Sequence, residues 1–176
     1  MALARVYDVT SNSTTGITIG STTPGTEFPI LWGVSNTSEF NISAVRVGVY
    51  SGTSASYPSN GTITWRLRRV GQAATFTTGL QATATAVSIG QSTTAAASSW
   101  YYSTLANATG TFSVMTASPL WEQTIPCTAG ANWGEWFTPG FEINVGPGQA
   151  TLALTYLYGN GTSATVDLTA GLVISE

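Results

Sequence analysis

The chain is 176 residues long, which is enough for one domain with a sizeable core that needs no metal or disulfide. Five arginines stand against eight acidic residues, lysine and histidine are absent, and only 7% of the residues are charged. This composition excludes the basic patch of a nucleic-acid-binding protein and removes the usual groups of acid–base and Schiff-base catalysis, so we expect no enzyme, no catalytic residue, no cofactor and no metal site.

The first 20 residues are expected to form an N-terminal arm or edge strand. An extended arm over Leu3 to Ile19 could add a strand to the sheet of a neighbouring subunit. The start of the chain lacks the apolar stretch of a secretory signal, and no segment reaches the ~18 apolar residues of a membrane-spanning helix. We therefore expect no membrane partner, and a single domain over residues 21–176.

Alternation of apolar and polar residues, the period of a half-buried β-strand, dominates the rest of the chain. It runs through residues 40–44, and a second apolar set then begins at Val45 and continues to Val49. Further alternating segments occur at 63–68, 112–116, 152–158 and 166–174. Many short strands between turn residues, with no amphipathic helix, predict an all-β fold. We expect an antiparallel β-sandwich of jelly-roll-like form with an extended N-terminal arm.

Two connecting segments carry further expectations. Residues 77–110 are rich in Ala, Thr and Ser, and we interpret them as a long excursion between two halves of the sandwich that contributes one or two edge strands. Gly159-Asn160-Gly161 has the residue types of a tight turn. Segments 151–158 and 163–175 are therefore expected to pair as a hairpin.

Arg66, Arg68 and Arg69 form the only local cluster of positive charge. On an extended strand, Arg66 and Arg68 point to one face and Arg69 points to the other. One interpretation is a protein interface in which these guanidinium groups bind carboxylates of a neighbouring subunit. The alternative is pairing inside the chain. The candidate internal partners are Glu27, Glu39 and Asp167.

The run Trp100-Tyr101-Tyr102 is a second candidate contact patch. Three consecutive aromatic residues break strict alternation, so at least one ring must face away from the core. Aromatic residues are enriched at protein interfaces because they combine a large apolar area with polar tips. Together with the three arginines, this run completes the set of candidate interface residues.

A series of landmarks follows a characteristic order along most of the chain. They are the segments 28–32, 42–47, 65–69, 121–123, 136–139, 141–143, 147–149 and 174–176. This order resembles a family of small all-β proteins encoded by tailed bacteriophages and prophages. The similarity is one of pattern and includes no catalytic signature.

The resemblance implies a structural virion protein, a cement or decoration protein that binds the outside of the capsid and reinforces contacts between subunits of the major capsid protein. It also implies a homotrimer located on the capsid surface after synthesis in the host cytoplasm. An alternative class is a carbohydrate-binding or tail-associated receptor-binding module with Trp100, Trp133 or Trp136 as stacking platforms. A third is a glycosidase that uses Glu135 and Glu142, since two carboxylates beside aromatic residues are typical of that chemistry.

Overall fold

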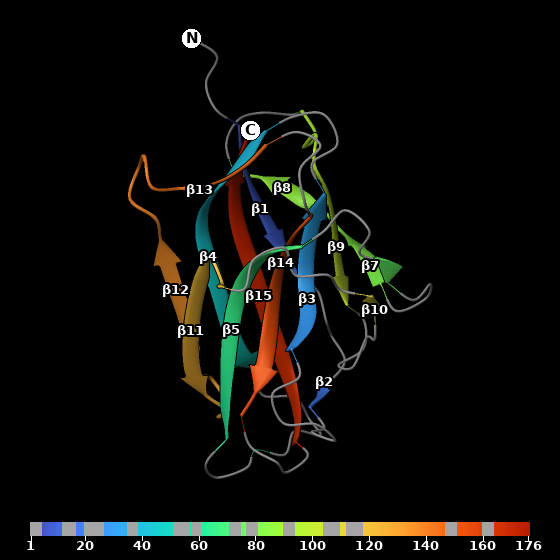
Figure 1. Ribbon diagram of the computed structural model, residues 1–176, viewed down its shortest axis with the longest axis vertical. Helices are drawn as coiled ribbons and strands as arrows, with labels where there is room; N and C mark the ends of the chain where they lie inside the picture. Colours follow the sequence, from blue (N-terminus) through green and yellow to red (C-terminus); the bar gives the residue numbers. More distant parts are fainter. Residues whose placement is uncertain are drawn as a thin grey trace.

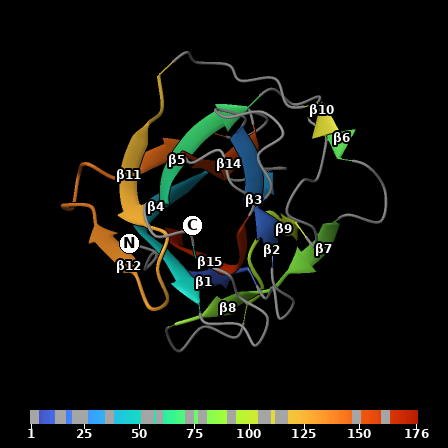
Figure 2. The same ribbon diagram turned by 90° about the horizontal axis from the view of Figure 1, so that it is seen from below.

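The computed structural model describes residues 5–11, 17–19, 27–34, 39–50, 57, 61–70, 75–76, 81–89, 94–103, 110–111, 118–146, 151–159 and 164–176. These residues form strands and no helix, which confirms the predicted all-β class. Two antiparallel sheets pack against each other as a β-sandwich (Figure 1, Figure 2). In the described part of the chain, accordingly, no helix is long and apolar enough to cross a bilayer.

Sheet 1 runs in the order β12 (Asn132–Trp136), β4 (Phe40–Tyr50), β15 (Ala164–Ser175), β1 (Val6–Thr10) and β8 (Ala86–Ser88). Two further strands join it, β13 (Ile143–Val145) on β4 and β2 (Ile17–Ile19) on β15. The long strands β4 and β15 pair along most of their length. Strands β12 and β8 are therefore its two opposite edges.

Sheet 2 runs in the order β11 (Trp121–Pro126), β5 (Thr62–Val70), β14 (Thr151–Tyr158), β3 (Glu27–Val34), β9 (Ser99–Ser103) and β7 (Gln81–Ala84). A separate two-stranded ladder consists of β6 (Thr75–Phe76) and β10 (Gly110–Thr111). The core lies between sheets 1 and 2. Its largest fully buried side chains include Trp65 and Trp100 from sheet 2 and Tyr7 and Phe40 from sheet 1.

The change of apolar phase at Val45 has a structural cause, which is a β-bulge in β4. The register between β15 and β4 passes from Ala44 to Ile42 over one step of β15, so Ser43 is the extra residue. A bulge of one residue exchanges the faces that later residues occupy. Ile42 before the bulge and Val45 after it are consequently both fully buried.

The expected hairpin between residues 151–158 and 163–175 is wrong. Strand β14 pairs with β3 and β5 in sheet 2, whereas β15 pairs with β1, β2 and β4 in sheet 1. Leu154 of β14 and Leu168 of β15 are both fully buried in the core. Each of the two strands has one apolar face to bury. A hairpin would bury both faces, but a connection that leads from sheet 2 to sheet 1 buries them equally well.

The beginning of the described chain forms part of this chain's own sandwich. Strand β1 lies inside sheet 1 between β15 and β8. Its alternating residues Tyr7 and Val9 are buried in the core, which fixes the strand in place. The other residues of the expected arm, 1–4, 12–16 and 20, lie outside the described residues.

The Ala/Thr/Ser-rich excursion supplies an edge to each sheet. Strand β7 is the outer strand of sheet 2, and β8 is the outer strand of sheet 1, with only Thr85 between them. Strand β9 then returns the chain to sheet 2. Residues 77–80, 90–93 and 104–109 of this segment lie outside the described residues.

Candidate functional site

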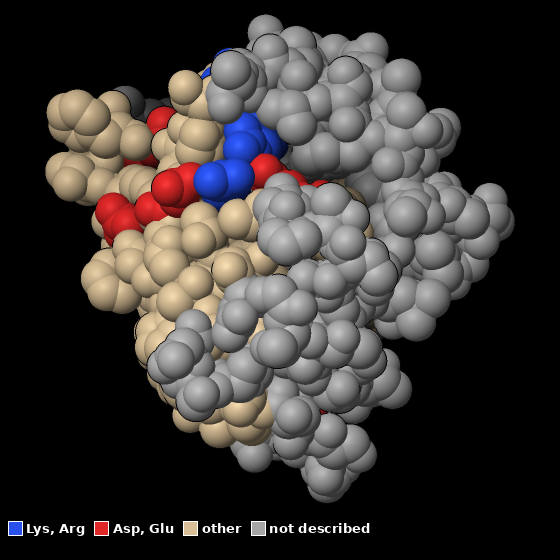
Figure 3. Space-filling view, turned by 60° about the horizontal axis from the view of Figure 1, so that its bottom comes forward, with Lys and Arg blue, Asp and Glu red and all other residues tan. Residues whose placement is uncertain are grey.

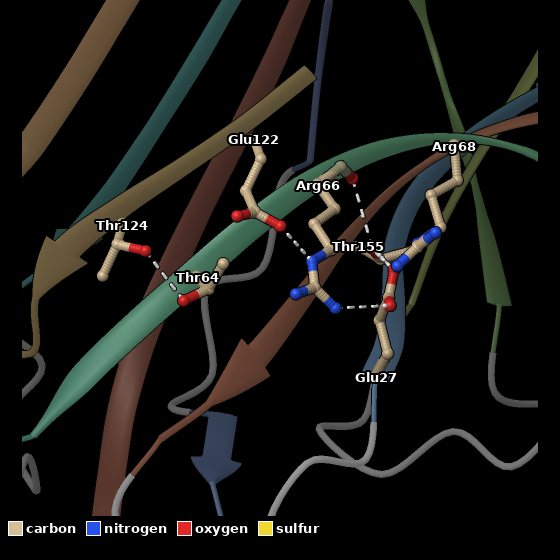
Figure 4. Close-up of polar contacts among 7 residues, drawn as sticks. All are labelled: Glu27, Thr64, Arg66, Arg68, Glu122, Thr124 and Thr155. Carbon is tan, nitrogen blue, oxygen red and sulfur yellow. Dashed lines mark hydrogen bonds and ion pairs between the residues drawn. The ribbon is translucent and has the colours of Figure 1, made fainter. Parts of the chain in front are cut away.

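The arginines of β5 occupy two faces of sheet 2, as alternation along the strand predicts. Arg66 and Arg68 lie on its outer face, together with Glu27 from β3, Thr155 from β14 and Glu122 from β11 (Figure 4). We call these five residues the outer-face charge cluster. The sheet register assembles it, because Arg66 lies directly opposite Glu122 on one side and Thr155 on the other.

The carboxylate of Glu27 is the centre of this cluster. It accepts a hydrogen bond from Arg68 Nε at 2.6 Å and another from Arg66 Nη1 at 3.2 Å. The hydroxyl of Thr155 donates to the same carboxylate. Arg66 Nε in turn donates to Glu122 at 2.6 Å. The side chains of Arg68 and Glu27 are only 8% and 15% exposed, so water screens their contact weakly.

Contacts within the cluster favour the charged forms of Glu27 and Arg66. Burial alone would raise the pKa of Glu27, but hydrogen bonds from Arg68 and Thr155 and the charge of Arg68 outweigh burial and lower that pKa below its ordinary value. Burial likewise opposes the charge of Arg66, yet hydrogen bonds to Glu122 and Glu27 raise the pKa of its guanidinium group. Two positive and two negative charges therefore cancel on one face, and Figure 3 shows basic and acidic side chains gathered side by side in one band.

Pairing inside the chain, the alternative interpretation of the arginines, is confirmed for Glu27, which binds both Arg66 and Arg68. Glu122 is a second partner that the sequence did not single out. Glu39 instead accepts a hydrogen bond from the side chain of Asn144. Because donors of both guanidinium groups are engaged here, binding of a neighbouring subunit's carboxylate would have to compete with these contacts.

Arg69 points to the opposite face of β5, toward sheet 1. Its Nη2 donates to the main-chain oxygen of Asn144 at 2.9 Å. Asn144 belongs to β13, so this contact joins the two sheets near one end of the sandwich. The three arginines of the predicted interface are therefore divided between a charge cluster and an inter-sheet contact.

The three aromatic side chains of residues 100–102 are distributed over both faces of β9. This confirms the prediction that at least one ring faces away from the core. Trp100 is 1% exposed and packs edge-on against Phe40 with ring centroids 5.4 Å apart. Tyr101 lies on the other face and stacks on Trp32 at 6.3 Å. Tyr101 and Tyr102 are half-buried, whereas Trp100 presents almost no surface to a partner.

Several aromatic side chains of the described residues are strongly exposed, and three of them lie on β12 and the loop that follows it. Trp133, Trp136 and Phe141 are 44%, 69% and 78% exposed, and we call them the aromatic edge. Strand β12 and its loop project from the side of the sandwich (Figure 1, Figure 2). The sequence alone suggests Trp133 and Trp136 only as stacking platforms and assigns no role to Phe141. The available signal was the density of aromatic residues around the turn at 139–140.

The two carboxylates of the glycosidase hypothesis make separate local contacts. Glu135 accepts a hydrogen bond from Trp121 Nε1 at 2.7 Å, which connects β12 to β11 across the open side of the sandwich. Glu142 accepts one from the main-chain N–H of Gly140 at 2.7 Å. Each carboxylate thus has a structural partner of its own. A catalytic pair is defined by its separation across a bound substrate, so the glycosidase hypothesis stays a prediction.

Reactive and metal-binding groups are sparse on the described part of the chain. No three histidine, cysteine or acidic side chains among the described residues are close enough to hold a metal ion. Cys127 is fully buried, and burial raises the pKa of its thiol. A reactive thiol needs the opposite shift, so Cys127 serves as a small apolar residue.

Comparisons with protein-family models, curated proteins and solved structures found no match for this chain. What the protein does must therefore be inferred from its surface and from its residue pattern.

Proposed function

We propose that this protein is a structural, non-enzymatic component of a virion that binds the outside of a capsid and reinforces contacts between subunits of the major capsid protein. The order of sequence landmarks supports the virion class. The single observation that carries the docking role is the aromatic edge, formed by Trp133, Trp136 and Phe141 on one edge strand and its loop.

Isolated exposed apolar residues are common on protein surfaces, but several large aromatics in one short segment are typical of a contact site. A fully exposed aromatic side chain presents about 150–250 Å² to water, and these three are only partly exposed, so covering all of them would remove roughly 300–450 Å². That area is smaller than a standard protein interface. Such a contact is therefore weak when made once, and it suits a partner that offers many equivalent sites.

A capsid shell is a partner of this kind. When several weak contacts are linked in one assembly, the later contacts form at a high effective concentration and the overall attachment becomes tight. We expect the protein to act as a homotrimer that presents three aromatic edges to adjacent major capsid protein subunits. The low charge of the chain suits a surface that is covered in the assembled particle.

Removing the aromatic edge is expected to release the protein from capsids. In the double variant Trp136→Ser/Phe141→Ser, occupancy should fall about tenfold or more, because the loss of one central interface aromatic costs about 2 kcal/mol. Both residues are largely exposed, so folding should be unaffected. The measurement is the copy number that sediments with virions lacking the protein, prepared from the phage or prophage that encodes it.

The matched control removes exposed apolar residues at the opposite edge of sheet 1. Val87 and Ile89 are 60% and 55% exposed on and just after β8, and Val87→Ser/Ile89→Ser should bind particles like the unchanged protein. Full occupancy by the aromatic double variant, or an equal loss in both double variants, would contradict a docking role for the aromatic edge.

A further inference from the structure

Strand β12 has a free edge, because it pairs with β4 on one side and with no other strand of the described chain (Figure 1). Main-chain hydrogen bonds on either side of the strand show which groups face β4. Val49 N–H donates to the oxygen of Ala131 at 2.7 Å, and Phe137 N–H donates to the oxygen of Ser43 at 2.9 Å. Alternate residues face the partner strand in an antiparallel ladder, so positions 131, 133, 135 and 137 are directed toward β4.

The main-chain groups of Asn132, Gly134 and Trp136 consequently point away from β4, toward the free edge. Gly134 is exposed and has no side chain, so its exposed surface is main chain. The strand also lacks the usual features that block an edge, because it contains neither lysine nor proline and its register with β4 is regular. The edge of β12 can therefore accept a further strand.

Two exposed tryptophans flank this edge on opposite faces of sheet 1. Trp133 lies opposite Val47, which belongs to the core, and Trp136 lies opposite Ala44 on the other face. Successive side chains of a strand point to alternate faces, so one set of side chains on an added strand would contact Trp133 and the other set would contact Trp136. A segment with apolar residues on both of its faces fits this arrangement.

The outer face of sheet 1 is bare beside the centre of β12. Gly134 lies opposite Arg46 on β4, and Arg46 lies opposite Gly171 on β15. An open hollow of about 540 Å³ has both glycines and Arg46 in its lining. Cross-strand neighbours share one face of a sheet, so a large side chain on an added strand has room over Gly134.

The charge at this edge favours a basic partner. Glu135 and Glu142 accept hydrogen bonds from Trp121 and Gly140, and neither carboxylate forms an ion pair with the described residues. A second copy of this chain would bring the same two carboxylates to the contact, and it has no lysine to offer them. A lysine or arginine of a different protein would neutralise them, so the charge favours a different protein over a second copy.

We propose that β12 accepts an extended segment of the major capsid protein as an additional strand of sheet 1. The segment has apolar residues on both faces and a lysine or arginine beside Glu135 or Glu142, and its main chain bonds to the outward groups of β12. This inference rests on the proposed virion role. It supplies the main-chain hydrogen bonds that strengthen an otherwise small aromatic contact.

The test compares two substitutions at one position. Gly134→Pro removes an N–H that points to the free edge and places a ring in the path of an added strand, whereas Gly134→Ala keeps the N–H. Both variants should fold, because position 134 has no positive φ and its Cβ would lie 3.7 Å from Arg46 Cγ, an ordinary contact. Thermal unfolding verifies the fold. Capsid occupancy of Gly134→Pro should fall about tenfold or more, and Gly134→Ala should bind like the unchanged protein.

A second measurement needs no capsid. The full chain selects from a displayed library of random peptides of about ten residues, and synthetic copies of the enriched peptides are titrated. We expect apolar residues at alternate positions, at least one lysine or arginine, and about tenfold weaker binding to Gly134→Pro than to Gly134→Ala. In the complex, hydrogen exchange at the N–H groups of Gly134 and Trp136 should slow about tenfold or more, whereas that of Trp133, which already faces β4, should change little.

Equal capsid occupancy of Gly134→Pro and Gly134→Ala would overturn strand addition and leave the docking role intact. Failure of the unchanged protein to attach would overturn the virion role, and the peptide selection would then test the edge alone. Enriched peptides that bind both variants equally, enrichment of acidic peptides only, or no enrichment would overturn strand addition. An oligomer that loses mass in Gly134→Pro would show that a second copy occupies the edge, and would likewise overturn the proposal.

Discussion

Glu27→Gln is expected to destabilise the protein by about 3–5 kcal/mol, the cost of breaking a buried ion pair by removing one partner. The substitution keeps the shape of the side chain but takes the countercharge from two arginines. Arg66 retains Glu122, whereas Arg68, at 8% exposure, loses the carboxylate that accepts its Nε–H. Chemical denaturation followed by fluorescence should show a lower transition midpoint with an unchanged slope.

The matched control for this substitution is Glu122→Gln in the same cluster. Glu122 contacts Arg66 at 2.6 Å but its side chain is 45% exposed, so the solvated pair should contribute less than about 1 kcal/mol. A cost for Glu122→Gln equal to that of Glu27→Gln, or a negligible cost for both, would show that burial of the Glu27 carboxylate does not determine the strength of the cluster.

The same comparison has an expected pH dependence. The pKa of Glu27 is lower in the folded protein than its ordinary value of 4.5, so ionised Glu27 stabilises the fold above that value. As the pH falls through the lowered folded-state pKa, this contribution is lost. The stability difference between the unchanged protein and Glu27→Gln should be constant near neutral pH and shrink on acidification. A difference that grows with acid would have the wrong sign.

Gly33→Ala is expected to cost about 3 kcal/mol through overpacking of the core. A Cβ atom at position 33 would lie 2.6 Å from Trp100 Cη2 and 2.7 Å from two other atoms of the indole ring. The ring cannot move aside freely, because Trp100 is 1% exposed and packs against Phe40. Thermal or chemical unfolding of the variant measures this cost.

Two further variants separate this clash from a general effect of replacing glycine in a strand. Gly134→Ala on the edge strand β12 meets nothing closer than 3.7 Å and should be neutral or slightly stabilising. Trp100→Leu should cost less in the Gly33→Ala background than alone, because the smaller side chain relieves the clash. Additive costs in the double variant would mean that the ring and the glycine do not interact as described.

Sequence pattern identified the local properties of this fold. A strand with one buried face has apolar residues at alternate positions, and this pattern correctly predicts the all-β class. The change of phase at Val45 likewise marks the bulge at Ser43. The residues of a strand do not by themselves determine which of the two sheets the strand joins. Strands β14 and β15 were expected to pair because their turn residues suit a hairpin, yet the same residue types serve a connection between sheets.

The same contrast between local sequence pattern and long-range strand pairing applies to the candidate sites. Glu27 could be named as one of three partners for the arginines because opposite charges attract, but only the register of β3, β14 and β5 determines which carboxylate reaches them. The alignment of Gly134 and Gly171 on either side of Arg46 likewise depends on the register of three separate strands. Sequence spacing does not indicate that alignment, and only the density of aromatic residues around the turn at 139–140 indicates the exposed segment that contains Phe141.

The most direct test of the proposed virion role is a cryo-electron microscopy reconstruction of phage particles that have been assembled in the presence of this chain. We expect a β-sandwich in three copies on the outside of the head, with Trp136 and Phe141 of each copy covered by the major capsid protein. Particles that carry this chain only on the tail, or that bind it through a face other than the aromatic edge, would contradict this account.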